Sequence, residues 1–360
     1  MSAYEKLKEE LRREPRTWMV TGAAGFIGSN LLETLLKLDQ NVIGLDNFAT
    51  GFQRNLDQVA EAVSPEQWGR FRFIKGDITD RDDCLAACEG AEIILHQAAI
   101  NSAPRSIDDP WTSHRVNVNG FVTLYLAAKD AGVKRFVYAS SSTVYGDDAR
   151  LPKVEENIGR PLSPYGATKQ MGEQYAYIFA KTYDFPSIGL RYFNVFGARQ
   201  TFEGGYAAVI PTWITSMLRN EPVYINGDGS TSRDFCYIEN AVQANLLAGT
   251  TTNPEALDRA YNVAVGDRTT LSTLFEMLKT GLRELDPSLP DMQPVYRDFR
   301  AGDVPHSLAD ISKARDLLGY QPTHRIADGI DAALDWYRKY ADYLSLFNAR
   351  KNVCSELGVQ

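Results

Sequence analysis

Three glycines, Gly22, Gly25 and Gly28, constrain the fold of this chain more than any other feature of its sequence. They follow the apolar stretch 17–21 and open an amphipathic stretch of helical periodicity. Glycines at this spacing between a strand and a helix make a tight turn and allow backbone N–H groups to approach a pyrophosphate. The apolar stretch 41–47 then completes a βαβ unit of the kind that binds dinucleotides.

Strand-like and helix-like stretches continue to alternate as far as residue 197. Strands are expected at 71–77, 91–99, 134–141 and 186–197, and helices at 80–90, Trp111–Ala131 and Tyr165–Tyr183. This alternation is typical of an α/β fold with a Rossmann-type, doubly wound parallel sheet. The later elements are short and irregular, as expected of a smaller C-terminal α/β lobe that binds a substrate.

The same pattern predicts how the chain divides. The predicted segments are an N-terminal helical extension (1–16), a nucleotide-binding Rossmann domain (17–197), a substrate lobe (198–345) and a C-terminal tail (346–360). Residues 234–247 are expected to return to the Rossmann domain. The strand-like stretches 222–227 and 259–265 are assigned to the smaller lobe.

Composition excludes several classes of function. A formal net charge of −8 and a pI near 5.2 argue against a nucleic-acid-binding surface. Because no apolar stretch approaches the ~20 residues of a membrane span and no signal peptide opens the chain, we expect a cytoplasmic protein without membrane partners. Four cysteines and four histidines are too few and too scattered for a disulfide framework or a metal site. Cys84 and Cys88 are expected to be buried packing residues.

Acidic residues at two predicted strand ends bear on the cofactor. Asp46 closes the second strand, where a carboxylate can accept hydrogen bonds from both adenosine ribose hydroxyls and would repel a 2′-phosphate. The sequence therefore favours NAD over NADP. Asp77 closes the third strand, where it either meets the adenine edge or caps its own strand end.

A tyrosine and a lysine form the centre of a candidate catalytic site. Tyr165 and Lys169 are four residues apart at the start of a predicted helix, so their side chains share one face. A phenol is a poor base at neutral pH, but a nearby ammonium group and a positive nicotinamide ring would stabilise the phenolate and lower its pKa. Ser141, at the end of the strand 134–141, can hydrogen-bond the same hydroxyl or a ketone oxygen.

The chain from about residue 17 to 340 resembles the extended short-chain dehydrogenase/reductases and, within them, the UDP-galactose 4-epimerase-like group. The resemblance is carried by TGAAGFIGSN, GLDNFATG, KGDITD, HQAA, NVNG, SSSTVYGD, SPYGATK, GLRYFNVFG, SRDFCYIEN and RAGDVPHSLAD. The stretch ETLLKLDQNVIGLDNFATG and the N-terminal extension are similar to those of bacterial UDP-N-acetylglucosamine 4-epimerases. The resemblance implies an NAD-dependent isomerase with a UDP-sugar substrate, and a homodimer formed through the helices at Trp111–Ala131 and Tyr165–Tyr183.

The resemblance also implies roles for individual residues, with Ser141, Tyr165 and Lys169 as the catalytic group. The implied cofactor-binding residues are Gly22, Gly25, Phe26, Ile27, Gly28, Asp46, Asn47, Asp77, Ile78, Gln97, Ala98, Asn117, Tyr165 and Lys169. The implied substrate-binding residues are Asn101, Arg105, Ser141, Ser142, Thr143, Asn194, Gln200, Ala208, Val209, Tyr224, Ile225, Arg233, Arg300, Asp303 and Ser307. Among these, Arg233 and Arg300 are expected to bind the diphosphate, because a guanidinium group suits phosphate oxygens.

Two features of the resemblance bear on the reaction. Relatives that dehydrate or decarboxylate the sugar carry carboxylates just after the catalytic serine, where this chain has Ser142 and Thr143. The resemblance therefore implies reversible C4 epimerisation, in which a hydride leaves C4 for NAD⁺, the 4-ketose turns, and the hydride returns to the opposite face. Ser307 occupies a position where relatives restricted to plain hexoses carry a tyrosine, which favours conversion of UDP-GlcNAc to UDP-GalNAc.

One departure from the N-acetyl-selective group leaves the sugar open. That group shows a Leu-Gly-Ser run after the HQAA stretch, whereas this chain has Ile100, Asn101 and Ser102. A UDP-hexuronic acid, UDP-GlcNAcA or UDP-GlcA, is then an alternative substrate, with Arg105 pairing with its C6 carboxylate, and so is a dual specificity for UDP-Glc and UDP-GlcNAc. An alternative of another class is a non-catalytic NAD-binding regulator, which would lack one of the three catalytic residues.

Overall fold

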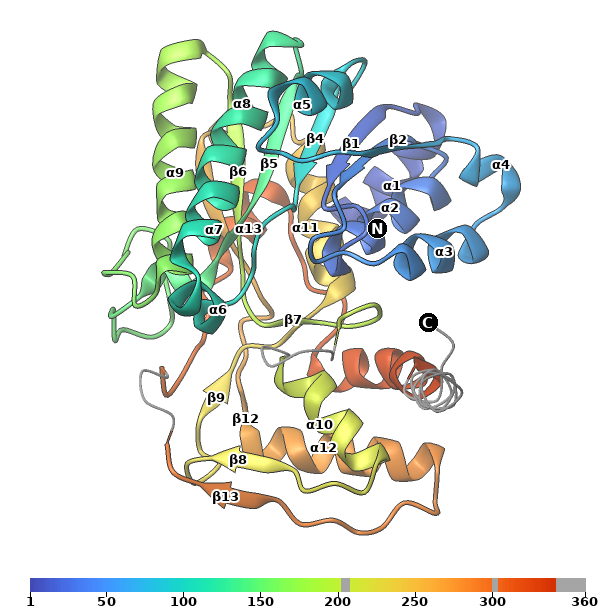
Figure 1. Ribbon diagram of the computed structural model, residues 1–360, viewed down its shortest axis with the longest axis vertical. Coiled ribbons are helices and arrows are strands. Elements are labelled where there is room, and N and C mark those ends of the chain that lie inside the picture. The colour runs from blue at the N-terminus through green and yellow to red at the C-terminus, as the bar shows by residue number, and fades with distance from the viewer. Residues whose placement is uncertain (202–207, 300–303, 341–360) are drawn as a thin grey trace, which may run out of the picture.

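A seven-stranded parallel sheet forms the centre of the larger lobe in the computed structural model, which describes residues 1–201, 208–299 and 304–340 (Figure 1). The strand order is β11 (Arg259–Val263), β6 (Ser187–Tyr192), β5 (Arg135–Ser141), β4 (Ile93–His96), β1 (Thr17–Thr21), β2 (Asn41–Asp46) and β3 (Phe71–Lys75). The connections reverse direction between β1 and β4, and doubly wound sheets bind ligands in the crevice at such a point. The predicted Rossmann-type fold is confirmed.

Helices cover both faces of this sheet, and each layer has its own apolar cluster. One layer contains α2 (Phe26–Lys37) and α11 (Ile238–Thr250), with α1 (Ala3–Arg13), α3 (Gln53–Ala62), α4 (Pro65–Trp68) and α13 (Ser312–Leu318) beside them. The other contains α5 (Arg81–Cys88), α8 (Phe121–Asp130) and α9 (Pro164–Tyr183). Cys84 and Cys88 are fully buried in the second cluster, so they pack in the core. No helix of the described chain is long and apolar enough to cross a bilayer.

The single helix predicted at Trp111–Ala131 is wrong in its middle part. A short helix, α7 (Pro110–His114), is followed by a π-helical turn (Arg115–Gly120) and then by α8. A π-helical turn accommodates an extra residue and changes the direction of side chains. Here it contains Asn117, whose buried side chain bonds to both backbone groups of Ile100.

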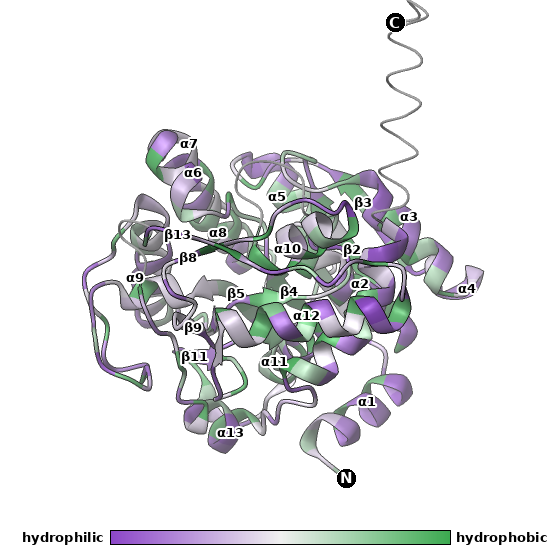
Figure 2. Ribbon diagram, turned by 90° about the horizontal axis from the view of Figure 1, so that it is seen from below, coloured by the Kyte–Doolittle hydropathy of each residue, from purple (hydrophilic) through white to green (hydrophobic). Residues whose placement is uncertain are grey.

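The smaller lobe lies beyond one end of the main sheet, as the lower part of Figure 1 shows. Its elements are α10 (Val209–Leu218), α12 (Leu271–Leu285), the parallel pair β8 (Tyr224–Asn226) and β13 (Val295–Arg297), and the antiparallel pair β9 (Ser232–Arg233) and β12 (Thr269–Thr270). Figure 2 shows α12 with a hydrophobic and a hydrophilic side. The buried side includes Leu274, Phe275, Leu278 and Leu282, and α12 packs against α10.

The chain passes between the lobes more than once. The assignment of residues 259–265 to the smaller lobe is wrong, because β11 pairs in parallel with β6 at the edge of the main sheet. Helix α11 also packs on the main sheet, against β4, β5 and β6. A two-stranded sheet of β7 (Val195–Phe196) and β10 (Cys236–Tyr237) lies between the lobes. The apolar sequence of a short strand indicates that the strand is buried, but it does not indicate which sheet the strand joins. This explains the error.

Candidate active site

The glycine turn predicted from the sequence lies between β1 and α2. Gly22 has a φ of 68°, in the left-handed region that favours glycine. A Cβ atom on Gly28 would lie 2.7 Å from the carbonyl carbon of Gly22, so only glycine allows the helix to start this close to the turn. The N-cap residue Gly25 has no side chain to cap the helix, and the first N–H groups of α2, at Phe26 and Ile27, have no intrahelical acceptor. This uncapped helix start fits a pyrophosphate.

Asp46 is fixed beside that turn, at the carboxyl end of β2. Its carboxylate accepts backbone hydrogen bonds from Ala24 at 2.9 Å and from Phe48 at 2.7 Å. Burial raises the pKa of Asp46, while these N–H groups act in the opposite direction. A carboxylate in this place suits the ribose hydroxyls of NAD and opposes the 2′-phosphate of NADP.

Asp77 and Asn47 lie together at the ends of β3 and β2. Asn47 Nδ2 donates to one Asp77 oxygen at 2.9 Å, and the other oxygen accepts from the Thr79 N–H and hydroxyl, both at 2.8 Å. Burial alone would raise the pKa of Asp77, but these hydrogen bonds lower it below its ordinary value. Asp77 therefore caps its strand end, and a contact with adenine stays a prediction.

Thr21 joins the ends of β1 and β4, a role that its sequence position does not signal. Its hydroxyl accepts the N–H groups of Gln97 and Ala98, both at 3.1 Å, and lies 2.8 Å from His96 Nδ1. With both lone pairs used, the hydroxyl donates to Nδ1, so the proton of the neutral imidazole is on Nε2. Burial lowers the pKa of His96 to about 3. The Gln97 side-chain amide is also bonded within the protein, and its implied contact with the cofactor stays a prediction.

The structure brings the three predicted catalytic residues together at the start of α9 and the end of β5. Lys169 Nζ lies 5.7 Å from the centroid of the Tyr165 ring and donates to the Ala139 carbonyl at 2.8 Å. Ser141 Oγ accepts hydrogen bonds from Thr143, from N–H at 3.2 Å and from Oγ1 at 2.9 Å. Since both its lone pairs are used, the Ser141 hydroxyl is oriented as a donor, and it forms a hydrogen bond with Tyr165.

Burial dominates the acid–base properties of this group. It raises the pKa of Tyr165 to about 12, although the hydrogen bond from Ser141 acts in the opposite direction. Burial also lowers the pKa of Lys169 to about 8, against the effect of the Glu173 carboxylate. The lowered pKa that we expect of Tyr165 therefore requires the positive charge of a bound nicotinamide in addition to Lys169.

Asn117 supports the start of α9 from the π-helical turn. Its Nδ2 donates to Thr168 Oγ1 at 3.1 Å and to the Ile100 carbonyl at 3.0 Å, and the Thr168 hydroxyl donates to the Tyr165 carbonyl at 2.8 Å. The Tyr165 N–H donates to Ser106 Oγ at 2.9 Å. Both amide protons of Asn117 are thus used within the protein, and its implied role in cofactor binding stays a prediction.

Two adjoining cavities share Asn194 and Arg233. One of them is lined by Ser142 and Thr143, which follow Ser141, but neither is lined by Ser141, Tyr165 or Lys169. The larger, of about 680 Å³, is lined by residues that include Gln200, Ala208, Val209, Trp213, Tyr224 and Phe299. The smaller, of about 400 Å³, is lined by residues that include Ser142, Thr143, Lys153, Phe193, His306 and Ser307. We call them the nucleotide cavity and the sugar cavity. Each has the size of a small-molecule site.

Most of the predicted substrate residues reach these cavities, and some do not. Within the described chain, the sugar cavity is lined by Ala103, Pro104 and Ile107, on and beside α6 (Ala103–Asp108), but not by Asn101 or Arg105. Ile225, between Tyr224 and Asn226 of the nucleotide cavity, is fully buried and lines neither cavity. Arg300 and Asp303 lie outside the described residues.

Lys153 and His306 line the sugar cavity although the sequence did not single them out. His306 Nδ1 lies 2.9 Å from Ser232 Oγ. The Lys153 ammonium donates to the Asp148 carbonyl, and the backbone of Lys153 pairs with residues 308–310. His306 directly precedes Ser307 in a recognised motif and could have been found there. Lys153 lies in an irregular segment whose sequence carries no such signal.

Comparison with known proteins agrees with this geometry. Residues 18–264 match the family described as NAD dependent epimerase/dehydratase. A UDP-glucose 4-epimerase of Mycolicibacterium smegmatis is 36% identical over 89% of this chain and 98% of its own length. The UDP-N-acetylglucosamine 4-epimerase of Methanobrevibacter ruminantium, solved with UDP-N-acetylmuramic acid, has a TM-score of 0.82 at 32% identity, over 91% of this chain and 99% of its own.

A third relative acts on a different sugar. The UDP-glucuronic acid 4-epimerase of Bacillus cereus, solved with UDP-glucuronic acid and NAD, has a TM-score of 0.79 at 30% identity, over 90% of this chain and 99% of its own. The chain belongs to the NAD-dependent epimerase/dehydratase family. Within that family it is an enzyme of the UDP-sugar 4-epimerase group, with NAD as its cofactor.

Proposed function

We propose that this enzyme interconverts UDP-N-acetylglucosamine and UDP-N-acetylgalactosamine. The observation that carries the choice of sugar is Ser307 at the wall of the sugar cavity, where its small side chain leaves room for an acetamido group. The Ser307 N–H donates to the Ser232 carbonyl at 3.0 Å, so its position in the wall is fixed. Ser142 adds a second small polar side chain to the same cavity.

The proposed reaction follows from the hydrogen bonds of the catalytic group. Bound NAD supplies reversible hydride acceptance. Tyr165, as a phenolate stabilised by the Lys169 ammonium, takes the proton of the sugar 4-hydroxyl and as a neutral phenol later returns it. Ser141, oriented as a donor by Thr143, binds the oxygen at C4. Because Ser142 and Thr143 follow Ser141, no carboxylate stands next to it to remove another proton of the sugar.

A UDP-hexuronic acid is the second candidate substrate, and Lys153 favours it. Its cationic side chain and His306 line the sugar cavity, where a C6 carboxylate would find a positive charge. The charge of Lys153 is offset in part by Asp148, whose carboxylate lies 3.7 Å away. This partial neutralisation makes the N-acetylated sugar the better supported substrate.

Turnover of defined substrates tests the proposal. Purified protein is incubated separately with UDP-GlcNAc, UDP-GlcNAcA, UDP-GlcA and UDP-Glc, and products are identified by proton NMR. We expect the highest kcat/KM for UDP-GlcNAc. Faster turnover of either uronic acid would support the second candidate, and turnover of none of the four would refute the choice of sugar class.

We also propose that two copies of the chain associate through α8 and α9. These helices lie side by side at the edge of the molecule in Figure 1. On α9, Met171, Tyr175 and Ile178 share one face and are 42%, 38% and 50% exposed. A continuous apolar face of this kind supports an interface between identical subunits. Light scattering on purified protein tests it, and a monomer mass would refute it.

A further inference from the structure

Glu173 lies one helical turn beyond Lys169 on α9, and its side chain is buried. One carboxylate oxygen accepts from Ser140 Oγ at 2.5 Å and from Arg191 Nε at 2.8 Å, and the other accepts from Arg191 Nη2 at 2.7 Å. Ser140 and Arg191 are register partners on β5 and β6, so both side chains emerge on the face that α9 covers. Glu173 therefore joins the helix to two strands.

These contacts add to two others between α9 and the end of β5. Tyr165 is hydrogen-bonded to Ser141, and Lys169 donates to the carbonyl of Ala139. Glu173 binds Ser140, which lies between those two strand residues. Three helix residues at four-residue spacing thus contact three consecutive strand residues. The last of the three, Glu173, fixes the strand end without reaching the cleft.

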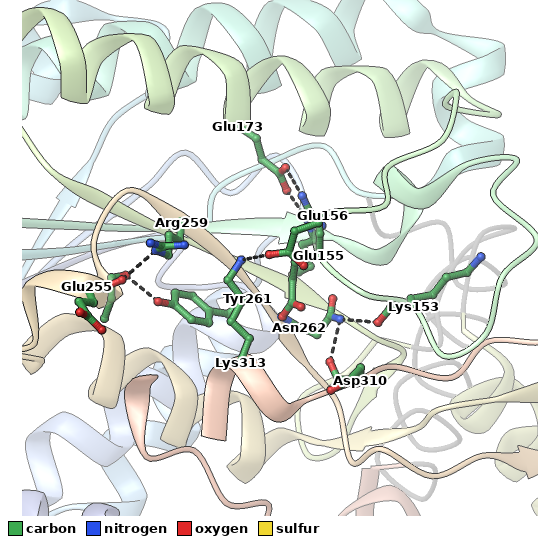
Figure 3. A network of polar contacts seen from close by, with 12 residues as sticks. Lys153, Glu155, Glu156, Glu173, Glu255, Arg259, Tyr261, Asn262, Asp310 and Lys313 are labelled. Carbon is green, nitrogen blue, oxygen red and sulfur yellow. Dashed lines mark hydrogen bonds and ion pairs between the residues drawn. The ribbon is translucent and has the colours of Figure 1, made fainter. Parts of the chain in front are cut away.

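The Glu173–Arg191 pair also supports the wall of the sugar cavity. Arg191 Nη1 donates to the Tyr145 hydroxyl at 3.1 Å and to the Glu155 carbonyl at 2.8 Å, and the Tyr145 hydroxyl donates to Asn262 at 2.6 Å. Tyr145 ends the turn η2 (Ser142–Tyr145) and itself lines the sugar cavity. Figure 3 shows Glu173 directed from α9 toward the group around Glu155, Glu156 and Asn262.

Electrostatics give Glu173 a second effect, on Lys169. The titratable groups that face Lys169 are His96 from β4, Tyr138 from β5, and Tyr165 and Glu173 from α9. Burial keeps His96 and Tyr138 neutral, because it lowers the pKa of the first and raises the pKa of the second. Among these groups Glu173 supplies the negative charge, which opposes the effect of burial on the pKa of Lys169.

We propose that Glu173 is a positioning residue of the epimerase site, which holds the end of β5 against α9 and places a negative charge one helical turn from the Lys169 ammonium. The proposal rests on the proposed catalytic roles of Tyr165 and Lys169. Without this charge, Lys169 loses its proton at a lower pH. The phenolate of Tyr165, deprived of its ammonium partner, then forms only at a higher pH.

The pH profile of kcat for Glu173→Gln tests the proposal, measured with the UDP-sugar that the wild-type enzyme turns over. We expect the acid limb, which reports formation of the Tyr165 phenolate, to move to higher pH, and the basic limb, which reports loss of the Lys169 proton, to move to lower pH. Each should move by about one pH unit, so that the profile narrows. Glu156→Gln is the matched control, because it removes the same charge from a neighbouring ion pair with Lys313, at 3.0 Å, that does not reach β5. Its profile should equal that of the wild type.

A second variant separates the charge from the geometry. Glu173→Asp keeps the charge but shortens the side chain, so the limbs should return toward their wild-type positions while kcat stays reduced. If Glu173→Gln does not fold, because it leaves Arg191 buried without its carboxylate, Glu173→Gln/Arg191→Met removes both partners. Because the positive charge of Arg191 is lost as well, the narrowing in this variant should have the same direction and a smaller size.

An unshifted profile, with kcat reduced equally at every pH, would overturn the proposal in favour of a purely structural role. That result is distinguishable from failure of the catalytic assignment. In the same assay, Tyr165→Phe should be inactive. If Tyr165→Phe retains activity, the assigned base is wrong, whatever the profile of Glu173→Gln.

Discussion

Replacing Gly28 with alanine should separate the two functions of the glycine turn, helix packing and cofactor approach. The new Cβ would lie 2.7 Å from the Gly22 carbonyl carbon and 3.1 Å from Ala23 Cα, whereas ordinary contacts begin near 3.4 Å. The atoms in the way belong to the backbone, so rotation of a side chain cannot relieve the overlap. Helix α2 must therefore move away from the end of β1.

The magnitude follows from the cost of overpacking. Forcing an extra methyl group into a packed site costs roughly 1–3 kcal/mol, and a backbone obstacle places Gly28→Ala at the upper end. With an unfolding entropy of about 2 cal/mol/K per residue, a loss of about 3 kcal/mol lowers the Tm of a chain of this length by roughly 4 °C. Displacement of the helix start should also weaken NAD binding.

Gly25→Ala is the matched control, because a Cβ there meets only the Gly22 carbonyl oxygen closely, at 3.1 Å. Gly25 is the N-cap of α2, on the side that a pyrophosphate approaches, so this variant should lose NAD affinity with little change in Tm. Scanning calorimetry with added NAD and without it, together with NAD content after purification, measures both effects. Equal Tm values for Gly28→Ala and wild type would refute the packing argument.

The remaining predictions concern the catalytic base, the sugar and stability. Tyr165→Phe should lower kcat by about 10²–10⁴-fold with NAD still bound, and a loss of less than about tenfold would contradict its role. Ser307→Tyr should reduce kcat/KM for UDP-GlcNAc by about 10- to 200-fold and spare UDP-Glc, whereas equal losses would exclude the pocket argument. Burial raises the pKa of Asp234 from 3.8 to about 6, so the folded protein favours the protonated carboxyl group more than the unfolded chain does. As the pH rises from 4 to 6 this preference is lost, and the free energy of unfolding should fall by up to about 3 kcal/mol. Asp234→Asn cannot titrate and should remove this slope in urea unfolding, so a slope like that of the wild type would count against the explanation.

The buried Asp234 carboxylate also holds separate segments of the chain together. It is fully buried, and its two oxygens accept the N–H groups of Val265 at 2.9 Å, Gly266 at 3.1 Å and Ala309 at 3.2 Å. It directly follows Arg233, which lines both cavities. One carboxylate therefore joins three segments that are distant in the sequence, beside the proposed substrate site.

The sequence by itself determined the features that depend on neighbours along the chain. The glycine turn, the acid at Asp46 and the helix that carries Tyr165 and Lys169 were all readable, because tight turns and four-residue helical spacing are local properties. The alternation of strands and helices gave the doubly wound sheet for the same reason. These features were enough to indicate an NAD-binding enzyme.

Tertiary structure decided what depends on residues far apart in the sequence. The position of β11 at the edge of the main sheet, the π-helical turn around Asn117, and the binding of Glu173 to Ser140 and Arg191 have no periodic signature. The sugar cavity likewise takes Lys153 and His306 from segments that only folding brings together. Such contacts form because burial and hydrogen bonding act between the surfaces of different elements. The order of residues along one strand or helix does not specify which other element will pack against that strand or helix.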